Sequence, residues 1–261
     1  MPRPAAAVTG GCAAVLVSAL LVACSTGEDA TSTGPLFPSG SAASSASPAP
    51  ATESTAIPES SEATPGDAAD AAAAVDTALA TLDTLEVKGR APKTGYDRAQ
   101  FGQTWADVDR NGCDTRNDIL ARDLTDVVFK EGSCRVLSGV LDDPYTGQRI
   151  SFVRGEDTSA DVQIDHVVAL SDAWQKGAQQ LTPERREELA NDPANLLAVD
   201  GSANLQKSDG DAATWLPANT SFRCTYVSRQ IEVKAAYGLW VTQAEKDAMV
   251  RVLGDCGDAP E

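Results

Sequence analysis

Five side chains in the second half of the sequence have the chemistry that phosphodiester hydrolysis needs: Asp165, His166, Asn195, Asn204 and Lys207. A carboxylate and an amide oxygen are hard ligands that suit Mg²⁺ or Mn²⁺. An imidazole beside the carboxylate has an ordinary pKa of about 6.5 and can take a proton from water at neutral pH. A lysine near the start of a helix can meet a phosphate oxygen. Metal, base and cation together are what hydrolysis of a phosphodiester requires.

Each of these residues also has a structural interpretation. A lone histidine is more often structural than catalytic, and Asn195 could simply form a turn. Asn204 could cap a helix, and Lys207 could be a surface charge. Residue type alone therefore leaves both interpretations open.

Short predicted elements place these side chains. Alternation over residues 162–165 predicts a strand that ends at Asp165 and His166. Residues 196–199 predict a second short strand, and 203–207 can open a helix. Between the strands, Thr182-Pro183-Glu184 indicates the start of another helix, because proline is favoured at the first helical position.

The flanking segments predict more helix than strand. We expect helices over 114–129, 221–237 and 242–253, and one from Asp67 to a stop near Gly89. Two further strands are expected at 134–141 and 149–154, around a turn at 142–147. The expected class is α+β, a mostly helical domain with few short strands.

The N-terminus is typical of an exported lipoprotein. Residues 1–24 hold a short apolar run that ends in Leu21-Val22-Ala23-Cys24, which is similar to the bacterial lipobox with Cys24 as the lipidated residue. An ordinary secretory signal is the alternative. Residues 25–66 contain no Lys or Arg and are rich in Ala, Ser, Thr and Pro, so we expect a disordered tether. The folded domain is expected over 67–256, followed by a tail at 257–261.

The charge balance excludes some functions. The chain has 21 basic and 38 acidic residues, a net charge of −17. This argues against a cationic nucleic-acid coat and against a polybasic membrane binder. Beyond the N-terminus, no stretch is apolar for the roughly 18 residues that a membrane span needs, so a polytopic membrane protein is excluded. Residues 86–256 carry 20 basic and 27 acidic residues, so the domain is acidic as well.

Four cysteines follow the signal segment. An even number in an exported chain indicates two disulfides, and sequence proximity favours Cys113–Cys134 and Cys224–Cys256 among three pairings. A zinc site is the weaker alternative, because the sequence has no CxxC pair.

Sequence blocks around the five candidate residues resemble the HNH endonuclease superfamily. The blocks are DHVVAL at 165–170, AW at 173–174, GA at 177–178, NDPANLL at 191–197, NLQKSDGD at 204–211 and WLP at 215–217. The sequence is most similar to secreted bacterial HNH-family proteins related to the C-terminal nuclease domain of GmrSD-type restriction enzymes. The core of the resemblance covers 161–217, and YDR at 96–98 and CDTR at 113–116 extend it over most of 90–253.

This resemblance implies a ββα-metal (HNH) finger and a role for each residue. Asp165 and Asn204 would bind one divalent metal, Mg²⁺ or Mn²⁺, and His166 would be the general base. Asn195 would brace the loop that holds His166, and Lys207 would lie near the scissile phosphate. Two departures are visible: Asn204 stands where the family motif ends in histidine, and the connection from His166 to Asn195 is long.

The resemblance also extends to substrate contacts. Arg98 and Arg116 are the expected substrate-binding residues. An acidic domain is unusual for a nuclease, because phosphate contacts usually need a basic surface. A basic rim could form if the fold brought together Arg98, Arg116, Lys207, Arg223 and Arg229. Weak, salt-sensitive and non-specific binding is expected.

The leading hypothesis is a membrane-anchored, extracytoplasmic, metal-dependent endonuclease. It would hydrolyse DNA, with RNA as a second substrate, and no protein partner is implied. One alternative is a catalytically inert binding or structural lipoprotein of the envelope on the same fold. Another is a metal-dependent hydrolase of a different envelope phosphodiester.

Overall fold

The computed structural model describes residues 65–257, with side chains from 70 to 256. The signal segment, Cys24, nearly all of the expected tether and the last four residues lie outside this range, so the predictions made for them remain predictions. Among the described helices, none combines the length and apolar character needed to cross a membrane. The helix expected from Asp67 is α1, Pro65–Thr84.

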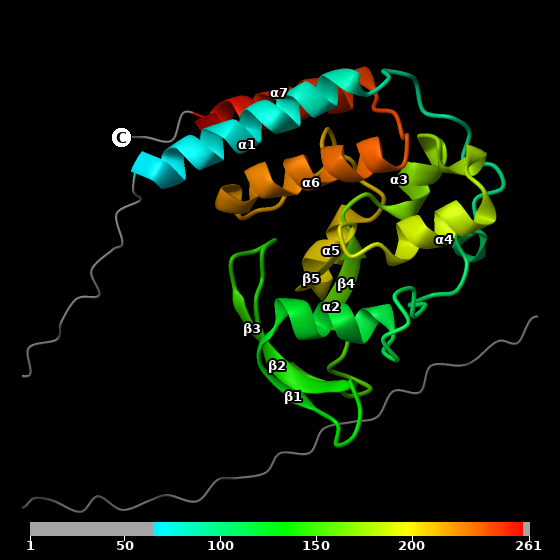
Figure 1. Cartoon of the computed structure of the whole chain (residues 1–261), viewed down its shortest axis with the longest axis vertical. Coiled ribbons are helices and arrows are strands. Elements are labelled where there is room, and N and C mark those ends of the chain that lie inside the picture. The colour runs from blue at the N-terminus through cyan, green and yellow to red at the C-terminus, as the bar shows by residue number, and fades with distance from the viewer. Residues whose placement is uncertain (1–64, 258–261) are drawn as a thin grey trace, which may run out of the picture. The chain divides into compact units, whose positions relative to one another are not determined.

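The candidate residues lie on two paired strands and the helix that follows them. β4 (Val162–His166) pairs antiparallel with β5 (Leu196–Asp200), so that His166 lies opposite Leu196. Helix α5 (Gly201–Lys207) begins directly after β5, and the Asp200 carboxylate caps it by accepting a 2.7 Å hydrogen bond from the Ala203 amide. The order strand, long connection, strand, helix is the one predicted (Figure 1).

The long connection between β4 and β5 is mostly helical. It contains α3 (Leu170–Gln175), the 3₁₀-helix η2 (Ala178–Gln180) and α4 (Pro183–Asn191). Thr182 caps α4 through its side chain, as proline at the first helical position led us to expect. This connection brings the end of α4 beside the end of β4.

The prediction of one helix over 114–129 is wrong in its second half. Helix α2 covers Thr115–Asp123 with Asp114 as its cap, and the chain then continues as β1 (Thr125–Phe129). β-branched and aromatic side chains in this stretch favour an extended strand once a partner is present. The partner is β2 (Val136–Asp142), which also pairs with β3 (Arg149–Val153) in an antiparallel sheet ordered β1-β2-β3.

Four further helices are η1 (Arg98–Phe101), η3 (Thr220–Phe222), α6 (Arg223–Ala236) and α7 (Gln243–Gly257). Helix η1 packs on α3 and α4, and α6 and α7 share a hydrophobic core with β5. Helix α1 packs on both α6 and α7 (Figure 1). The predicted capping box of α7 is present, because the side chains of Thr242 and Glu245 each accept a hydrogen bond from the backbone amide of the other residue. Helices with two small sheets confirm the α+β class.

Two disulfides fasten separate elements. Cys113–Cys134 joins the loop before α2 to the β1–β2 hairpin, and Cys224–Cys256 joins α6 to α7. These are the two pairings that sequence proximity favoured. Both bonds agree with the prediction that the chain is exported, since disulfides persist in oxidising compartments.

Candidate active site

An open cavity of about 360 Å³ brings several predicted residues together. Asp165, His166, Asn204 and Arg98 all line it. Asp165 and His166 are consecutive at the end of β4, so their side chains leave opposite faces of the strand. The cavity lies between the end of β4 and α5, because both elements contribute lining residues.

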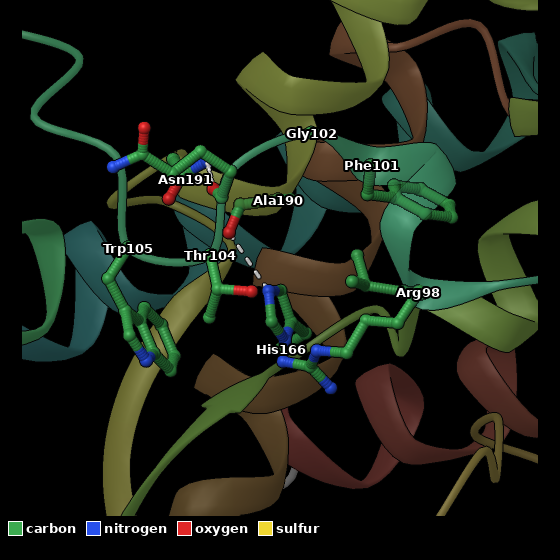
Figure 2. Close-up of a pocket in the computed structure, with 10 residues that line it drawn as sticks. Arg98, Phe101, Gly102, Thr104, Trp105, His166, Ala190 and Asn191 are labelled. Carbon is green, nitrogen blue, oxygen red and sulfur yellow. Dashed lines mark hydrogen bonds between the residues drawn. The ribbon is translucent and has the colours of Figure 1, made fainter.

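His166 is held as a neutral imidazole. Its Nε2 lies 2.9 Å from the Ala190 carbonyl oxygen, and because a carbonyl only accepts, Nε2 must donate (Figure 2). The lone pair of the neutral ring is therefore on Nδ1. Burial lowers the pKa of His166 from 6.5 to about 3; the Ala190 hydrogen bond opposes this shift, and the charges of Arg98 and Lys207 add to it. The ring is thus unprotonated at neutral pH, which is the state a general base requires.

An aromatic ring and a small pocket complete the surroundings of His166. The Trp105 indole is nearly parallel to the imidazole, with ring centroids 6.1 Å apart and an interplanar angle of 12°. A pocket of about 10 Å³ lies beside them, lined also by Thr104 and Asn191 (Figure 2). That volume is about the size of one water molecule.

Asn195 ties the chain after His166 to the end of α4. Its Oδ1 accepts from the Val168 amide at 2.8 Å, and its Nδ2 donates to the Leu189 carbonyl at 3.2 Å. Its backbone carbonyl accepts from the Val167 amide. The side chain is completely buried. These bonds connect the segment carrying His166 to the segment carrying its Ala190 partner.

Asp165 has two buried partners. The Tyr145 hydroxyl donates to its Oδ2 at 2.5 Å, and the Lys207 ammonium lies 3.0 Å from the same carboxylate. Burial raises the pKa of Tyr145 well above its ordinary value, and the charge of Asp165 raises it further, so the phenol keeps its proton. Tyr145 was missed in the sequence because it lies 20 residues upstream in the β2–β3 turn. A tyrosine within a polar turn was the one available signal.

Lys207 does not face the cavity. It is 1% exposed, and besides Asp165 its ammonium contacts the His166 carbonyl at 2.8 Å. The sequence placed this lysine near a scissile phosphate. In the structure it is the counter-ion of Asp165, because α5 follows β5 so closely that its last turn lies against the end of β4.

The donor atoms available for a metal are hard oxygens. Asn204 donates through Nδ2 to Gln163 Oε1 at 2.8 Å, and its own Oδ1 accepts no hydrogen bond from any described residue. Asp165 retains acceptor capacity, since a carboxylate has about four lone-pair sites. Within residues 65–257 no three His, Cys, Asp or Glu side chains converge as a metal cage. One carboxylate with one amide oxygen fits Mg²⁺, which keeps several waters and takes phosphate oxygens from the substrate.

The five cations that could have formed a basic rim do not converge on this cavity. Arg98 is exposed, lies beside His166 (Figure 2) and has no salt bridge with any residue in 65–257. Three other arginines donate to backbone carbonyls instead. Arg116 donates to Val162, and Arg223 donates to Pro217. Arg229 donates to the carbonyls of Pro193, Ala194 and Leu196. None of these three lines the cavity. Arg98 is the one member of this set of five that does.

The sequence is similar to known proteins. Residues 114–252 match the family described as the C-terminal domain of GmrSD restriction endonucleases. An uncharacterized secreted protein of Arthroderma benhamiae is 38% identical over 185 residues, which cover 70% of this chain and 86% of that protein. This relative is fungal, so the bacterial origin within the resemblance remains a prediction. No solved structure matches.

Proposed function

Because the chain belongs to the family of the C-terminal domain of GmrSD restriction endonucleases, we propose that it is an extracytoplasmic nuclease that hydrolyses phosphodiester bonds of nucleic acid. The observation that carries the proposal is the placement of His166. The Ala190 carbonyl fixes the ring so that Nδ1 carries the lone pair, and the residue lines a cavity together with Asp165 and the exposed Arg98.

The chain's own groups have separate tasks in this reaction. His166 takes a proton from the attacking water at Nδ1, while its Nε2–H stays bonded to Ala190. Asn195 keeps the two segments in register so that the ring does not rotate. Arg98 contacts the phosphate and offsets the charge that develops there.

We further propose that Asp165 and Asn204 hold one divalent ion, Mg²⁺ or Mn²⁺. When bound, the ion would polarise the phosphate and stabilise the leaving oxygen. Tyr145 and Lys207 orient the Asp165 carboxylate and offset its burial. Lys207 offsets part of the negative charge that Asp165 would present to a cation, so modest metal affinity is expected.

The test is cleavage of defined substrates by the purified chain. Plasmid DNA, single-stranded DNA and RNA are incubated with Mg²⁺ or Mn²⁺, and in parallel with a chelator. Cleavage that requires the metal and is lost in the His166→Ala protein supports the proposal. Intact substrates under all conditions would favour the inert binding protein.

Export and anchoring form a second proposal. The secreted relative supports export, and the cysteine at the end of the signal segment supports a lipid anchor at Cys24. Replacing Cys24 with Ser should move the protein from the membrane pellet to the soluble fraction. A mature N-terminus at another residue, unmodified in mass spectrometry of the wild-type chain, would contradict the anchor.

A further inference from the structure

The charges lining the open cavity are balanced, which is unusual for a site that binds a polyanion. The residues that line it include two cations, Lys93 and Arg98, and two acids, Asp165 and Asp209. Lys93 is not free, because its ammonium lies 2.9 Å from the Asp209 carboxylate. One unpaired cation, Arg98, therefore remains for a phosphate among the residues that line the cavity.

Duplex DNA binders use many such contacts. A protein that neutralises about six to ten phosphates gains most of its affinity by releasing counter-ions. Here Arg116, Arg223 and Arg229 are engaged by backbone carbonyls, and Lys207 is engaged by Asp165. The surrounding domain carries 20 basic and 27 acidic residues over 86–256 and would repel a duplex.

The same cavity offers apolar contacts instead. Leu205 on α5 is 73% exposed although it is a leucine, and the half-buried Tyr96 ring lines the cavity as well. Unpaired bases can use such surfaces, since contact with an aromatic ring is worth about 1–3 kcal/mol per base and does not depend on charge. Bases within a duplex are stacked and cannot reach them.

We infer that the site takes single-stranded nucleic acid, one phosphate at a time, and that Asp209 limits it to one phosphate by holding Lys93. This inference rests on the proposed nuclease function and narrows its substrate. Affinity then comes chiefly from base contacts at Leu205 and Tyr96. Removing the Asp209 charge would release Lys93 and give the site a second phosphate contact.

Binding is measured by fluorescence anisotropy with a 5′-labelled single-stranded deoxyoligonucleotide and with its duplex, over a range of NaCl concentrations. The full-length chain carries His166→Ala to prevent cleavage, and its fold is checked by circular dichroism. The same titrations are repeated with the wild-type chain in EDTA. For single strands, log K should fall with log salt with a slope of about −0.7. Duplex should bind more weakly.

Two matched variants test the role of Asp209. Asp209→Asn should steepen the slope to about −1.4 and tighten binding about twofold to fivefold at low salt. Asp83→Asn removes the same charge from a Lys–Asp pair of the same 2.9 Å length, formed with Lys246 between α1 and α7. This control should leave the slope unchanged. Equal effects of the two variants would overturn the role of Asp209.

Leu205→Ser should weaken single-strand binding, while Val250→Ser, which changes another exposed apolar residue, should not. A wild-type slope steeper than about −2, or duplex binding as tight as single-strand binding, would overturn the inference. Cleavage assays with Mn²⁺ keep the two proposals apart. Efficient cleavage of duplex would leave the nuclease function standing and refute the single-strand preference, whereas failure to cleave any nucleic acid would refute the function itself.

Discussion

His166 shows how one residue's surroundings set its chemistry. An exposed imidazole would be partly protonated near neutral pH, but burial keeps this ring neutral, and the Ala190 hydrogen bond fixes the lone pair on Nδ1. It is also the one histidine of the chain, so no second imidazole can replace it.

Replacing His166 with Ala should lower nuclease turnover by roughly 10²–10⁴-fold, which is the usual contribution of a general base. The fold should persist, because Asn195 and the β4–β5 pairing do not depend on the ring. Turnover is measured under single-turnover conditions alongside the melting temperature. A folded variant within a few-fold of the wild-type rate would contradict the role of the base.

The Asp165–Lys207 pair leads to a prediction about the stability of the domain. Lys207→Met should destabilise the domain by roughly 3–5 kcal/mol, because it leaves a buried carboxylate without its counter-ion. Adding Asp165→Asn to that variant should recover part of the loss, since the uncompensated charge is then gone. Urea unfolding of the two single variants and the double variant gives the coupling energy. Strictly additive losses would show that the two groups do not interact.

Among the elements, the junction between β5 and α5 matters most for the site. Asn204 and Lys207 reach the end of β4 because α5 starts without any loop after Asp200. Gly201 permits this turn, as a Cβ at that position would clash with the Ala160 carbonyl oxygen. The backbone at Gly201 therefore lies too close to the Ala160 carbonyl for a side chain to fit between them.

Gly201→Ala should destabilise the domain by about 1–3 kcal/mol, because the backbone must shift to relieve the clash. It should also weaken metal binding measured by calorimetry, since α5 carries Asn204. Gly254→Ala is the matched control within α7, where an added Cβ meets open space. That change should stabilise the protein by up to about 1 kcal/mol through helix propensity. If the two variants change the stability and the metal affinity equally, the junction does not require glycine at position 201.

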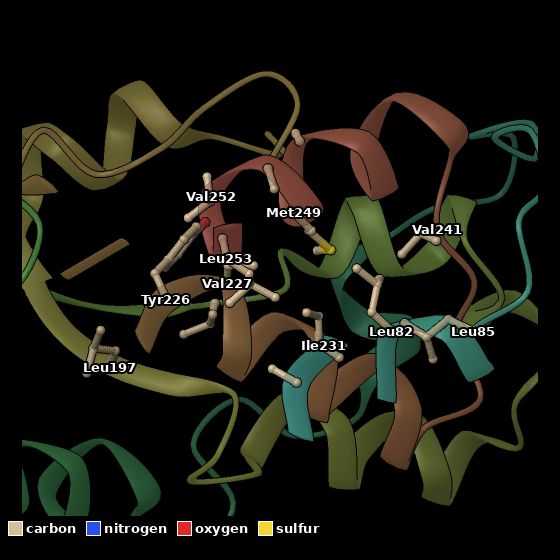
Figure 3. Packing of buried hydrophobic residues seen from close by; sticks show 14 of the residues in the cluster. Leu82, Leu85, Leu197, Tyr226, Val227, Ile231, Val241, Met249, Val252 and Leu253 are labelled. Atoms are coloured by element: carbon tan, nitrogen blue, oxygen red, sulfur yellow. The ribbon is translucent and has the colours of Figure 1, made fainter. Parts of the chain in front are cut away.

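Across the whole described domain, a hydrophobic core and a buried ionic cluster hold the helices together. The core packs α1, α6 and α7 through residues such as Leu82, Ile231 and Met249 (Figure 3). Next to it, six charged side chains form connected salt bridges: Arg90, Asp172, Lys176, Asp211, Lys234 and Glu245. This cluster links α3, α6, α7 and the segment after α5.

The ionic cluster predicts a loss of stability in acid. Burial tends to raise the pKa of Asp211, but the hydrogen bond and charge of Lys176, with those of Arg90, bring it from 3.8 down to about 2. A carboxyl whose pKa is depressed by folding stabilises the protein above its unfolded pKa, and this contribution is lost as pH falls from about 4 towards 2. The loss should be about 1–2 kcal/mol.

Urea unfolding at a series of pH values measures this effect. Asp211→Asn should be less stable than wild type at pH 7, and the difference between the two proteins should shrink as pH falls through that window. A difference that stays constant from pH 5 to pH 2 would contradict the assignment.

Much of the local structure followed from neighbouring residues. Alternation predicted β4, proline and threonine predicted the start of α4, and Thr242 with Glu245 predicted the cap of α7. These signals work because strand pleat, helix caps and short disulfide loops depend on residues close in sequence. The resemblance added the identities of Asp165, His166 and Asn204, which are among the residues that line one cavity.

Other features depended on packing between distant segments. Tyr145 reaches Asp165 from another sheet, Lys207 turns inward, and three of the five candidate rim cations bind backbone carbonyls away from the cavity. The change from α2 to β1 likewise required β2 as a partner. A side chain's type and position do not specify its direction or its partner, because a buried charge or an unpaired strand is stabilised only by groups that the fold brings to it.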